Sequence, residues 1–413
     1  LTGTPGFVDA FSGDYRLNGL SPCINAGTNQ GWMVGTTALD NDTRIRNTTV
    51  DLGAYEEGCV FVATNGNDAA DGLSWATAKQ TIQAGVDAAV NGDSVLVASG
   101  TYDVGSRTST LYSVNARVIA DKAVAIVAVA GAATTVIDGK LEGVGGVCMA
   151  STALLEGFTV RRCLGGIRGG SARHCLLTLN GHSGAYLTRI WDSTICSNSI
   201  YGSGAGANTC QLFNCLIFKN EAYYNGGGAY NSLLVNCTVA GNIGDETPND
   251  CSGCIDTNCV FSSSWSSNDE SLDPTGDPRF INPAAGDYRL NHDSPCRRIG
   301  IPYGWMAGAT DLDGKPRLQA GGVDFGAYQT AYRYVTTNGL PYASGHSWAE
   351  ARRSINDFAN DVAVQAGETI WVGPGTYEVT EALNGYRAYI PRPMSLRGAA
   401  GADQTILKAT SVE

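Results

Sequence analysis

The chain has 413 residues, of which 53 are glycine and only 16% are charged, and its formal net charge is −12. The negative charge argues against nucleic acid and anionic membrane surfaces as partners, and no apolar run reaches the roughly 18 residues that span a bilayer. A glycine-rich chain that is 43% hydrophobic indicates a turn-rich β structure with enough apolar side chains to fill a core.

A long repeat divides the chain. The segment GDYRLNGLSPCINAG near the N-terminus returns as GDYRLNHDSPCRRIG near the C-terminus, and the offset between Tyr15 and Tyr288 is 288 − 15 = 273 residues. The same offset still relates Trp75 to Trp348. A long period without slippage indicates tandem duplication of a whole structural unit. We therefore expect residues 1–57 to close one unit, 58–330 to form a complete unit (cap 58–92, coils 93–265, closing module 266–330), and 331–413 to open another.

An amphipathic cap helix is predicted ahead of the coils. Ser74, a good N-cap residue, precedes the sequence WATAKQTIQAGVDAAV. In this sequence Ile82, Val86 and Val90 share one helical face. Ser347 precedes the matching segment of the second copy, in which the equivalent face carries Ile355, Phe358 and Val362. Such a helix would cover the open end of a solenoid, where exposed strand edges invite aggregation.

A shorter period runs through residues 154–265. Two columns recur every 22 residues, namely Asn198, Asn220 and Asn242, and Cys215, Cys237 and Cys259. Upstream the step is 18, from Asn180 to Asn198. Coils this short cannot bury their own apolar face, so they are expected to stack at the ~4.8 Å spacing of paired strands. Strand-like runs such as LLVNCTV therefore predict an all-β fold, a parallel β-helix, and the usual hand of parallel crossovers makes it right-handed.

The repeated polar residues are expected to be structural. Stacked asparagines would form a ladder of side-chain amides at a corner, and stacked cysteines would point inward. Thirteen cysteines favour an oxidising compartment, with at least one thiol unpaired within the chain. The predicted disulfides are Cys251 with Cys254, or Cys148 with Cys163, although stacked cysteines would also be close enough to bridge.

Three segments resemble a known superfamily. FVATNGNDAADGLSWATAKQTIQAGVDAA, which starts at Phe61, resembles the cap of right-handed parallel β-helix repeat proteins of the pectate-lyase-like superfamily, and NGGGAYNSLLVNCTVAGN resembles their coil. Asp287–Gln329 is similar to the closing module of large exported bacterial β-helix proteins. The resemblance covers nearly the whole chain and implies the fold and an extracellular or cell-surface location. It leaves the activity open, because this fold carries lyases, hydrolases, adhesins and inert shafts.

Lyases of this superfamily place Asp side chains around calcium with an Arg or Lys as base, and its hydrolases use clustered Asp pairs. The candidates for such a cluster here are Glu156, His174, Arg189 and Asp192 on the earlier coils. With a basic group made of Arg161, Arg162, Arg168, Arg173 and Arg189, they would line a groove for sugar acids. We favour the alternative of a solvated coil surface, because the carboxylates do not recur as a column and no motif fixes a nucleophile, acid or base.

A second polar group recurs in both closing modules. Its members are Asp40, Arg44 and Asp51 in the first copy, and Asp313, Arg317 and Asp324 in the second, where Asp311 is added. Residues that persist while the coils differ predict a structural role, an Arg–carboxylate clamp that closes the module. The DLDG stretch at Asp311 and Asp313 also matches calcium-loop spacing, which leaves a calcium site as the alternative; no other cofactor is expected.

The sequence therefore predicts a non-enzymatic, extracellular structural or adhesive protein. The alternative is a polysaccharide lyase or glycoside hydrolase that acts on acidic polysaccharide. The expected partners are surface or extracellular polysaccharide and further copies of the chain, because residues 331–413 would open a unit that residues 1–57 of another copy would close. Such head-to-tail contacts build a filament, and a longer covalent repeat chain is the rival explanation.

Overall fold

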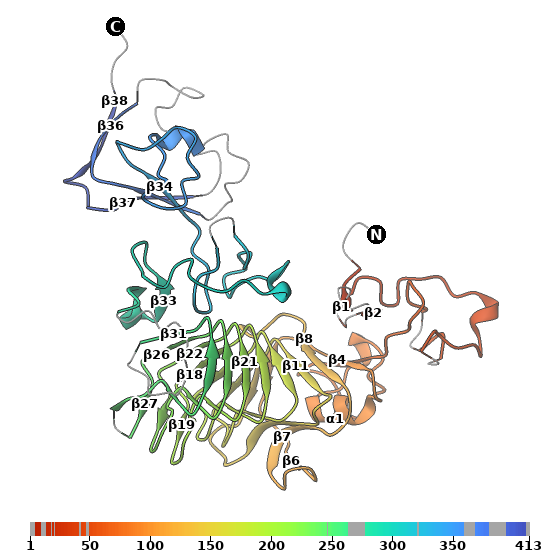
Figure 1. The fold of residues 1–413 in the computed structure, drawn as a ribbon. Helices are drawn as coiled ribbons and strands as arrows, with labels where there is room; N and C mark the ends of the chain where they lie inside the picture. Colours follow the sequence, from red (N-terminus) through yellow and green to blue (C-terminus); the bar gives the residue numbers. More distant parts are fainter. Residues whose placement is uncertain are drawn as a thin grey trace. The chain divides into compact units, whose positions relative to one another are not determined.

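The computed structural model describes residues 5–9, 14–17, 19, 21–40, 43–46, 49–245, 247–262, 277–319, 322–358, 368–379 and 394–409. The chain forms two compact units, one of residues 1–273 with 325–327 and one of residues 274–324 with 328–413 (Figure 1). The expected divisions at 57/58 and 330/331 stay predictions. Among the described residues, no helix has the length and apolar character needed to cross a membrane.

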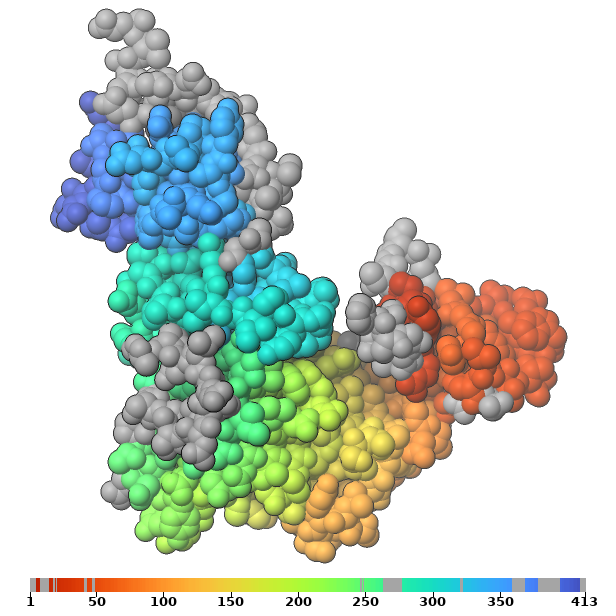
Figure 2. Space-filling view, in the orientation of Figure 1, coloured from red at the N-terminus to blue at the C-terminus, as the bar shows by residue number. Residues whose placement is uncertain are grey.

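The first unit is the predicted right-handed parallel β-helix. Three long sheets run along it, and each regular coil gives one strand to each sheet, so that successive coils lie directly against one another (Figure 1). In the space-filling view the surface of this unit changes along the coils from orange through yellow to green (Figure 2). All neighbouring strands in these sheets are parallel except β6 and β7.

Three long sheets and one small sheet build the coils. The nine-stranded sheet consists of β3 (Cys59–Val62), β4 (Ser94–Val97), β8 (Ala125–Ala128), β11 (Leu154–Glu156), β14 (Ser171–Arg173), β17 (Arg189–Trp191), β21 (Gln211–Phe213), β25 (Leu233–Val235) and β30 (Ile255–Thr257). The second long sheet is called the groove sheet, after the groove beside it that is described below. It has eight strands, β6 (Arg107–Thr108), β7 (Asn115–Ala120), β10 (Gly145–Met149), β13 (Ile167–Arg168), β16 (Ala185–Tyr186), β20 (Ala207–Asn208), β24 (Ala229–Tyr230) and β29 (Cys251–Ser252). The third sheet has eight strands, β5 (Gly100–Tyr102), β9 (Thr135–Asp138), β12 (Thr159–Arg161), β15 (Leu176–Thr178), β18 (Thr194–Cys196), β22 (Leu216–Phe218), β26 (Thr238–Ala240) and β31 (Val260–Phe261). A small fourth sheet contains β19 (Ser199–Ile200), β23 (Glu221–Ala222), β27 (Ile243–Gly244) and β28 (Thr247–Pro248).

The core lies inside the coils, where like residues stack in register. One column of fully buried side chains on the nine-stranded sheet is Leu155, Ala172, Ile190, Leu212 and Leu234. Ile217, Val239 and Phe261 stack in the same way on the third sheet. Because no coil can bury these side chains alone, stacking is what removes them from water.

Each coil turns its corners at residues in the left-handed conformation. The corner between the nine-stranded and third sheets has positive φ at His174, Asp192, Asn214, Asn236 and Asn258, with values between 48° and 57°. Asn and Asp tolerate this conformation better than most residues, because their short polar side chains bond locally. The corner geometry therefore accounts for the polar residue types in this column.

Asparagines form a ladder at the corner that follows the third sheet. The Nδ2 of Asn198 donates to Oδ1 of Asn220, and the Nδ2 of Asn220 donates to Oδ1 of Asn242, each at 2.9 Å. Asn242 continues the ladder to Oδ1 of Asp250, also at 2.9 Å. These side chains are buried, so the ladder satisfies amides that would otherwise be costly to remove from water.

Cysteines occupy an inward corner position that other coils fill with serine. The thiols of Cys215, Cys237 and Cys259 each lie within 3.4 Å of the carbonyl oxygen two residues earlier. Ser193 stands in the same column and donates its hydroxyl to the equivalent carbonyl of Trp191 at 2.6 Å. The thiol thus replaces a hydroxyl as a small corner donor.

The predicted disulfides are wrong for this structure, in which all thirteen cysteines are free thiols. Cys148 packs on the outer side of its strand with Ala116 and Ile119, whereas Cys163 lies in the core inside the coils. Strand alternation therefore points them to opposite faces. Cys251 and Cys254 both face the core as free thiols. A hydrogen bond between the two thiols lowers the pKa of Cys254.

The cap helix is shorter than the sequence pattern suggests. The helix α1 (Ile82–Ala88) begins after Thr81, whose hydroxyl accepts from the Ala84 amide, and Ser74 instead precedes the 3-10 turn η2 (Trp75–Thr77). The reason is that Lys79 pairs with Phe61 and Ala63 of the neighbouring backbone, which keeps the preceding residues extended. Ile82 and Val86 are buried as expected, but Val90 lies beyond the helix and is 54% exposed. In the second copy Ile355 and Phe358 are buried, and Val362 lies outside the described residues.

The two predicted closing modules contain the same hairpin and 3-10 turn at an offset of 273 residues. The first has β1 (Phe7–Asp9), β2 (Asp14–Leu17) and η1 (Gly31–Met33), and the second has β32 (Phe280–Asn282), η3 (Pro283–Ala285), β33 (Asp287–Leu290) and η4 (Gly304–Met306). The rest of the second unit contains β34 (Tyr332–Val335), η5 (Ile355–Phe358), β35 (Thr369–Val372), β36 (Gly375–Val379), β37 (Ser395–Gly398) and β38 (Thr405–Ala409). β34, β35 and β37 form one parallel sheet, and β36 pairs with β38.

Candidate functional site

Three of the four residues predicted for a catalytic cluster lie together on the nine-stranded side of the coils. His174 Nδ1 lies 3.5 Å from Glu156 Oε1, and His174 Nε2 lies 3.9 Å from Asp192 Oδ2. Arg189 instead donates its Nε to Gln211 Oε1 on the next coil, at 2.8 Å. The structure therefore brings an acid, an imidazole and a second acid together, while Arg189 is engaged by an amide.

The charges in this cluster neutralise one another. Arg173 Nη2 donates to Glu156 Oε2 at 2.8 Å, and Asn214 donates to Asp192 Oδ1. Burial raises the pKa of Glu156, but the hydrogen bonds from His174 and Arg173 outweigh it and hold that pKa below its ordinary value. The hydrogen bond with Glu156 raises the pKa of His174. A general acid needs a carboxyl with a raised pKa, whereas the pKa of Glu156 is lowered. The lowered pKa suits an ion-paired cluster on the surface.

Two further arginines of the basic group are also paired. Asp138 is fully buried, and Arg161 Nε reaches its Oδ2 at 2.9 Å while Arg162 Nη2 reaches the same oxygen at 2.5 Å. Against the effect of burial, the hydrogen bond from Arg162 holds the pKa of Asp138 below its usual range. Because a buried carboxylate needs such partners, these two arginines serve the fold.

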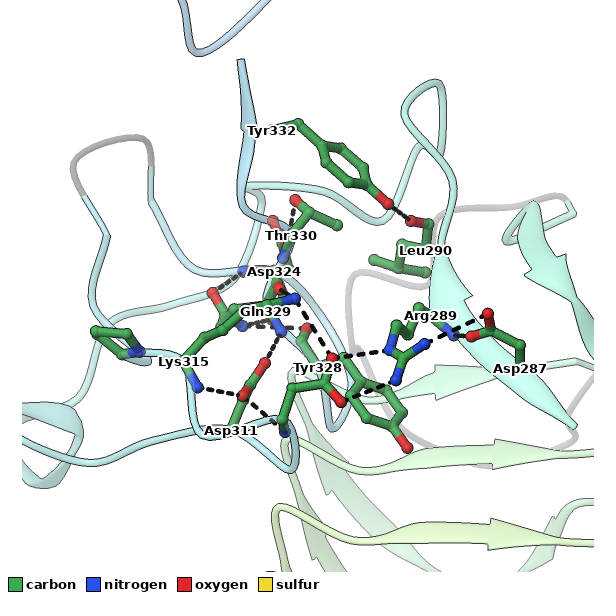
Figure 3. A network of polar contacts seen from close by, with 12 residues as sticks. Asp287, Arg289, Leu290, Asp311, Lys315, Asp324, Tyr328, Gln329, Thr330 and Tyr332 are labelled. Carbon is green, nitrogen blue, oxygen red and sulfur yellow. Dashed lines mark hydrogen bonds and ion pairs between the residues drawn. The ribbon is translucent and has the colours of Figure 1, made fainter. Parts of the chain in front are cut away.

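In the second closing module, the predicted clamp has different partners from those expected (Figure 3). Asp313 accepts two hydrogen bonds from Arg289, at 2.8 and 3.0 Å. The sequence instead predicted that Asp313 pairs with Arg317. Asp324 accepts from the amides of Arg298 and Thr330, at 2.8 and 2.5 Å. Arg317 is fully buried and donates its backbone N–H to Ala309.

The first closing module corrects the prediction in the same way. Arg44 Nη1 pairs with Glu56 Oε1 at 2.6 Å rather than with Asp40 or Asp51. Asp51 accepts from the backbone amides of Asn25 and Glu57, at 2.6 and 2.8 Å. The sequence pattern does not reveal these amide donors because they lie in irregular loops. Asp51 and its counterpart Asp324 therefore both bind backbone amides of loops, which is a structural role.

The Asp311–Asp313 stretch does not fit a calcium ion. Asp311 Oδ1 accepts from the amides of Asp313 and Lys315, at 2.9 and 2.7 Å, and its Oδ2 accepts from the Gln329 amide at 2.6 Å. Both oxygens of Asp313 face Arg289. Calcium requires several oxygens that converge on one point, and N–H donors occupy those directions here. Within the described residues, no three His, Cys, Asp or Glu side chains form a group that could hold a metal.

A groove of about 550 Å³ lies beside the groove sheet of the first unit. Its polar and aromatic lining includes Asn115, Cys148, Arg168, His182, Tyr186 and Asn208, together with glycine-rich loops. No Asp or Glu is among the described residues that line it. Burial raises the pKa of the Cys148 thiol to about 11, so this thiol adds no negative charge near neutral pH. The groove is therefore a cationic, carboxylate-free surface.

Arg168 supplies the positive charge of the groove. Its guanidinium carbon lies 4.6 Å from the centre of the Tyr112 ring and 4.9 Å from that of the Tyr186 ring. Its Nε is buried and has no hydrogen-bond partner. Gly169 makes this arrangement feasible, because a Cβ there would lie 2.4 Å from the Tyr112 hydroxyl. Two tyrosines thus hold the guanidinium of Arg168 in the groove.

The change in coil length explains why the surface is hollow at this point. Between the asparagine corner and the groove sheet, the coil from Asn180 to Ala185 takes 185 − 180 = 5 steps, but the next coil, from Asn198 to Ala207, takes 207 − 198 = 9. The longer segments of this coil and of the following coils contribute the strands of the small fourth sheet, the first of which is β19. Ile200 of β19 lines the groove. The short coils therefore form the floor, and the longer coils rise beside it.

Sequence reasoning placed Arg168 in a basic group but missed Tyr112 and Tyr186. The 18-residue step contained a signal for one of them, because Arg168 and Tyr186 are one such step apart and pair directly between β13 and β16. Tyr112 lies in an irregular turn before β7. No periodicity could have placed it.

Comparisons with known proteins found similar solved structures but no matching family. No protein-family model matches the chain, and no curated protein matches it. Among solved structures, the chain is similar to pectate lyase Pel9A, with 14% identity, a TM-score of 0.41, and coverage of 66% of this chain and 96% of that one. It is also similar to a rhamnogalacturonan lyase, with 13% identity, a TM-score of 0.29, and coverage of 53% of this chain and 65% of that one. At these values the parallel sheets, and not the likeness, carry the fold assignment.

Proposed function

We propose that this protein is an extracellular structural or adhesive β-helix that binds an acidic polysaccharide in the groove at Arg168 without cleaving it. The observation that supports the proposal is Arg168 itself, which lines the groove between the rings of Tyr112 and Tyr186 with no Asp or Glu among the described residues of the lining. A carboxylate is the ligand that matches a guanidinium in charge and planar geometry.

The groove suits a polymer rather than a small molecule. It is open, and its walls are backbone-rich loops with amide side chains, as at Asn115 and Asn208, which offer hydrogen bonds to sugar hydroxyls. The tyrosine rings beside Arg168 provide apolar faces next to the charge. One sugar acid would be held by its carboxylate while the chain on either side runs along the groove.

The proposal that the polymer is bound without cleavage is supported by where the acidic side chains lie. The carboxylates of Glu156 and Asp192 are paired on the nine-stranded side, and the described residues of the groove include none. The alternative, a polysaccharide lyase or glycoside hydrolase, is favoured by one observation, the proximity of Glu156, His174 and Asp192.

The test is to measure binding and turnover with the same polymers. Purified protein is titrated by calorimetry with uronic-acid oligosaccharides and with neutral oligosaccharides, and the mixtures are then incubated with calcium and assayed for new reducing ends and unsaturated products. We expect binding of the acidic series alone, a loss of about 10- to 100-fold in Arg168→Ala, and no products. Turnover that disappears in Asp192→Asn or Arg189→Ala would establish the enzyme instead. Head-to-tail association of copies stays a prediction, which sedimentation velocity tests.

A further inference from the structure

The longer coils carry three exposed tyrosines that the groove does not account for. Tyr201, Tyr223 and Tyr224 are 76%, 51% and 49% exposed. The ring centres of Tyr201 and Tyr223 are 4.2 Å apart, and Tyr224 lies 6.0 Å from Tyr201 and 5.0 Å from Tyr223. A contiguous cluster of exposed aromatic rings is uncommon on a solvated surface and marks a binding site.

Tyr201, Tyr223 and Tyr224 are called the tyrosine ridge. They lie in the segments that make the longer coils four residues longer than the short ones. Tyr201 directly follows β19, and the other two follow β23, the next strand of the same small sheet. The ridge also borders the groove, because Ile200, which lines the groove, immediately precedes Tyr201. Floor and ridge are therefore neighbouring parts of one surface of the first unit.

The charge on the ridge differs from that in the groove. The segments 199–204, 221–226 and 243–245 contain no Lys or Arg, and they carry the exposed acids Glu221 and Asp245. A carboxylated sugar would be repelled here, whereas the CH face of a neutral sugar can stack on a tyrosine ring without any charge. The ridge is matched to an uncharged part of a ligand whose acidic part occupies the groove.

We propose that the tyrosine ridge is a second sugar-binding surface, which stacks neutral residues of the polysaccharide whose acidic residue lies at Arg168. This inference rests on the proposed function, and it makes the ligand a mixed polymer of acidic and neutral sugars. The two surfaces then act as linked sites, so the second contact adds affinity without a second cost of association.

The experiment uses the full chain and a ladder of oligosaccharides that share one terminal uronic acid and are extended stepwise with neutral hexoses. In the wild type, affinity should rise by about 3- to 10-fold once the ligand is long enough to stack on a ring. Tyr201→Ala with Tyr223→Ala should remove this rise and leave the affinity of the shortest acidic ligand unchanged. Tyr201→Phe with Tyr223→Phe, which keeps both rings, should retain it, and Tyr342→Ala, which changes a 98% exposed tyrosine elsewhere, should have no effect.

The outcomes separate the two proposals. If the wild type fails to bind any acidic ligand, the groove proposal is wrong, and the ridge is then tested alone by chemical-shift changes of its tyrosine rings with neutral hexose oligomers. If acidic ligands bind but the rise with length persists in the double alanine variant, the ridge proposal is overturned. It is also overturned if the double alanine variant changes only the sedimentation coefficient, because the ridge is then a contact between copies.

Discussion

Two outer faces of the same coils use arginine in opposite ways. On the nine-stranded sheet, Arg173 lies directly opposite Glu156 in the strand ladder and pairs with it. On the groove sheet, Arg168 lies directly opposite Tyr186 in the equivalent ladder position. On these two faces, the residue one coil away thus decides whether the arginine forms an ion pair within the protein.

The largest expected effect comes from converting the groove into a paired face. Tyr186→Glu would give Arg168 the cross-strand partner that Arg173 already has. We expect affinity for uronic-acid oligosaccharides to fall on the order of 100-fold, because the ligand carboxylate must now displace an internal one. Calorimetry measures the effect, and Tyr186→Phe, which keeps the ring, serves as the control. Unchanged affinity in Tyr186→Glu would mean that Arg168 is not the ligand contact.

The two faces also differ in how far the sequence predicts them. The 18- and 22-residue steps predict the stacking of Asn198 on Asn220, because identical residues at a fixed step occupy the same place in successive coils. The same step could have predicted that Arg168 meets Tyr186. It could not have predicted Tyr112 or Glu56, because irregular loops have no period and their positions depend on tertiary packing. The candidate cluster at Glu156, His174 and Asp192 therefore stays a prediction from the sequence, whereas the groove at Arg168 was found only from the structure.

A smaller effect is expected on the paired face, from Glu156→Gln. The variant removes the carboxylate that holds Arg173 and His174, and we expect it to lower the free energy of unfolding by up to about 1 kcal/mol, since both partners are partly exposed. Binding in the groove should not change. A loss of binding in this variant would place the ligand on the nine-stranded face.

The stability that Glu156→Gln removes should depend on pH in a defined direction. The raised pKa of His174 contributes stability that is fully present below its unfolded value of 6.5 and is lost as pH rises through the folded pKa. The lowered pKa of Glu156 contributes stability that is present above its unfolded value of 4.5 and is lost as pH falls through the folded pKa. The difference between wild type and Glu156→Gln in urea unfolding should therefore be greatest between these two values. A difference that stays constant from acidic to alkaline pH would contradict the pairing.

The smallest effect is expected inside the coils, from exchanging a cysteine for the serine that occupies the same position in a neighbouring coil. Cys215 shares its corner column with Ser193, and both donate to the carbonyl two residues earlier. Cys215→Ser should therefore change the free energy of unfolding by less than about 0.5 kcal/mol, whereas Cys215→Val, which lacks the donor, should cost about 1 kcal/mol. Because the thiols are free, reductant should leave the unfolding midpoint of the wild type unchanged. A midpoint that drops on reduction would show that a disulfide joins neighbouring coils, and the serine-like role of the cysteines would then be wrong.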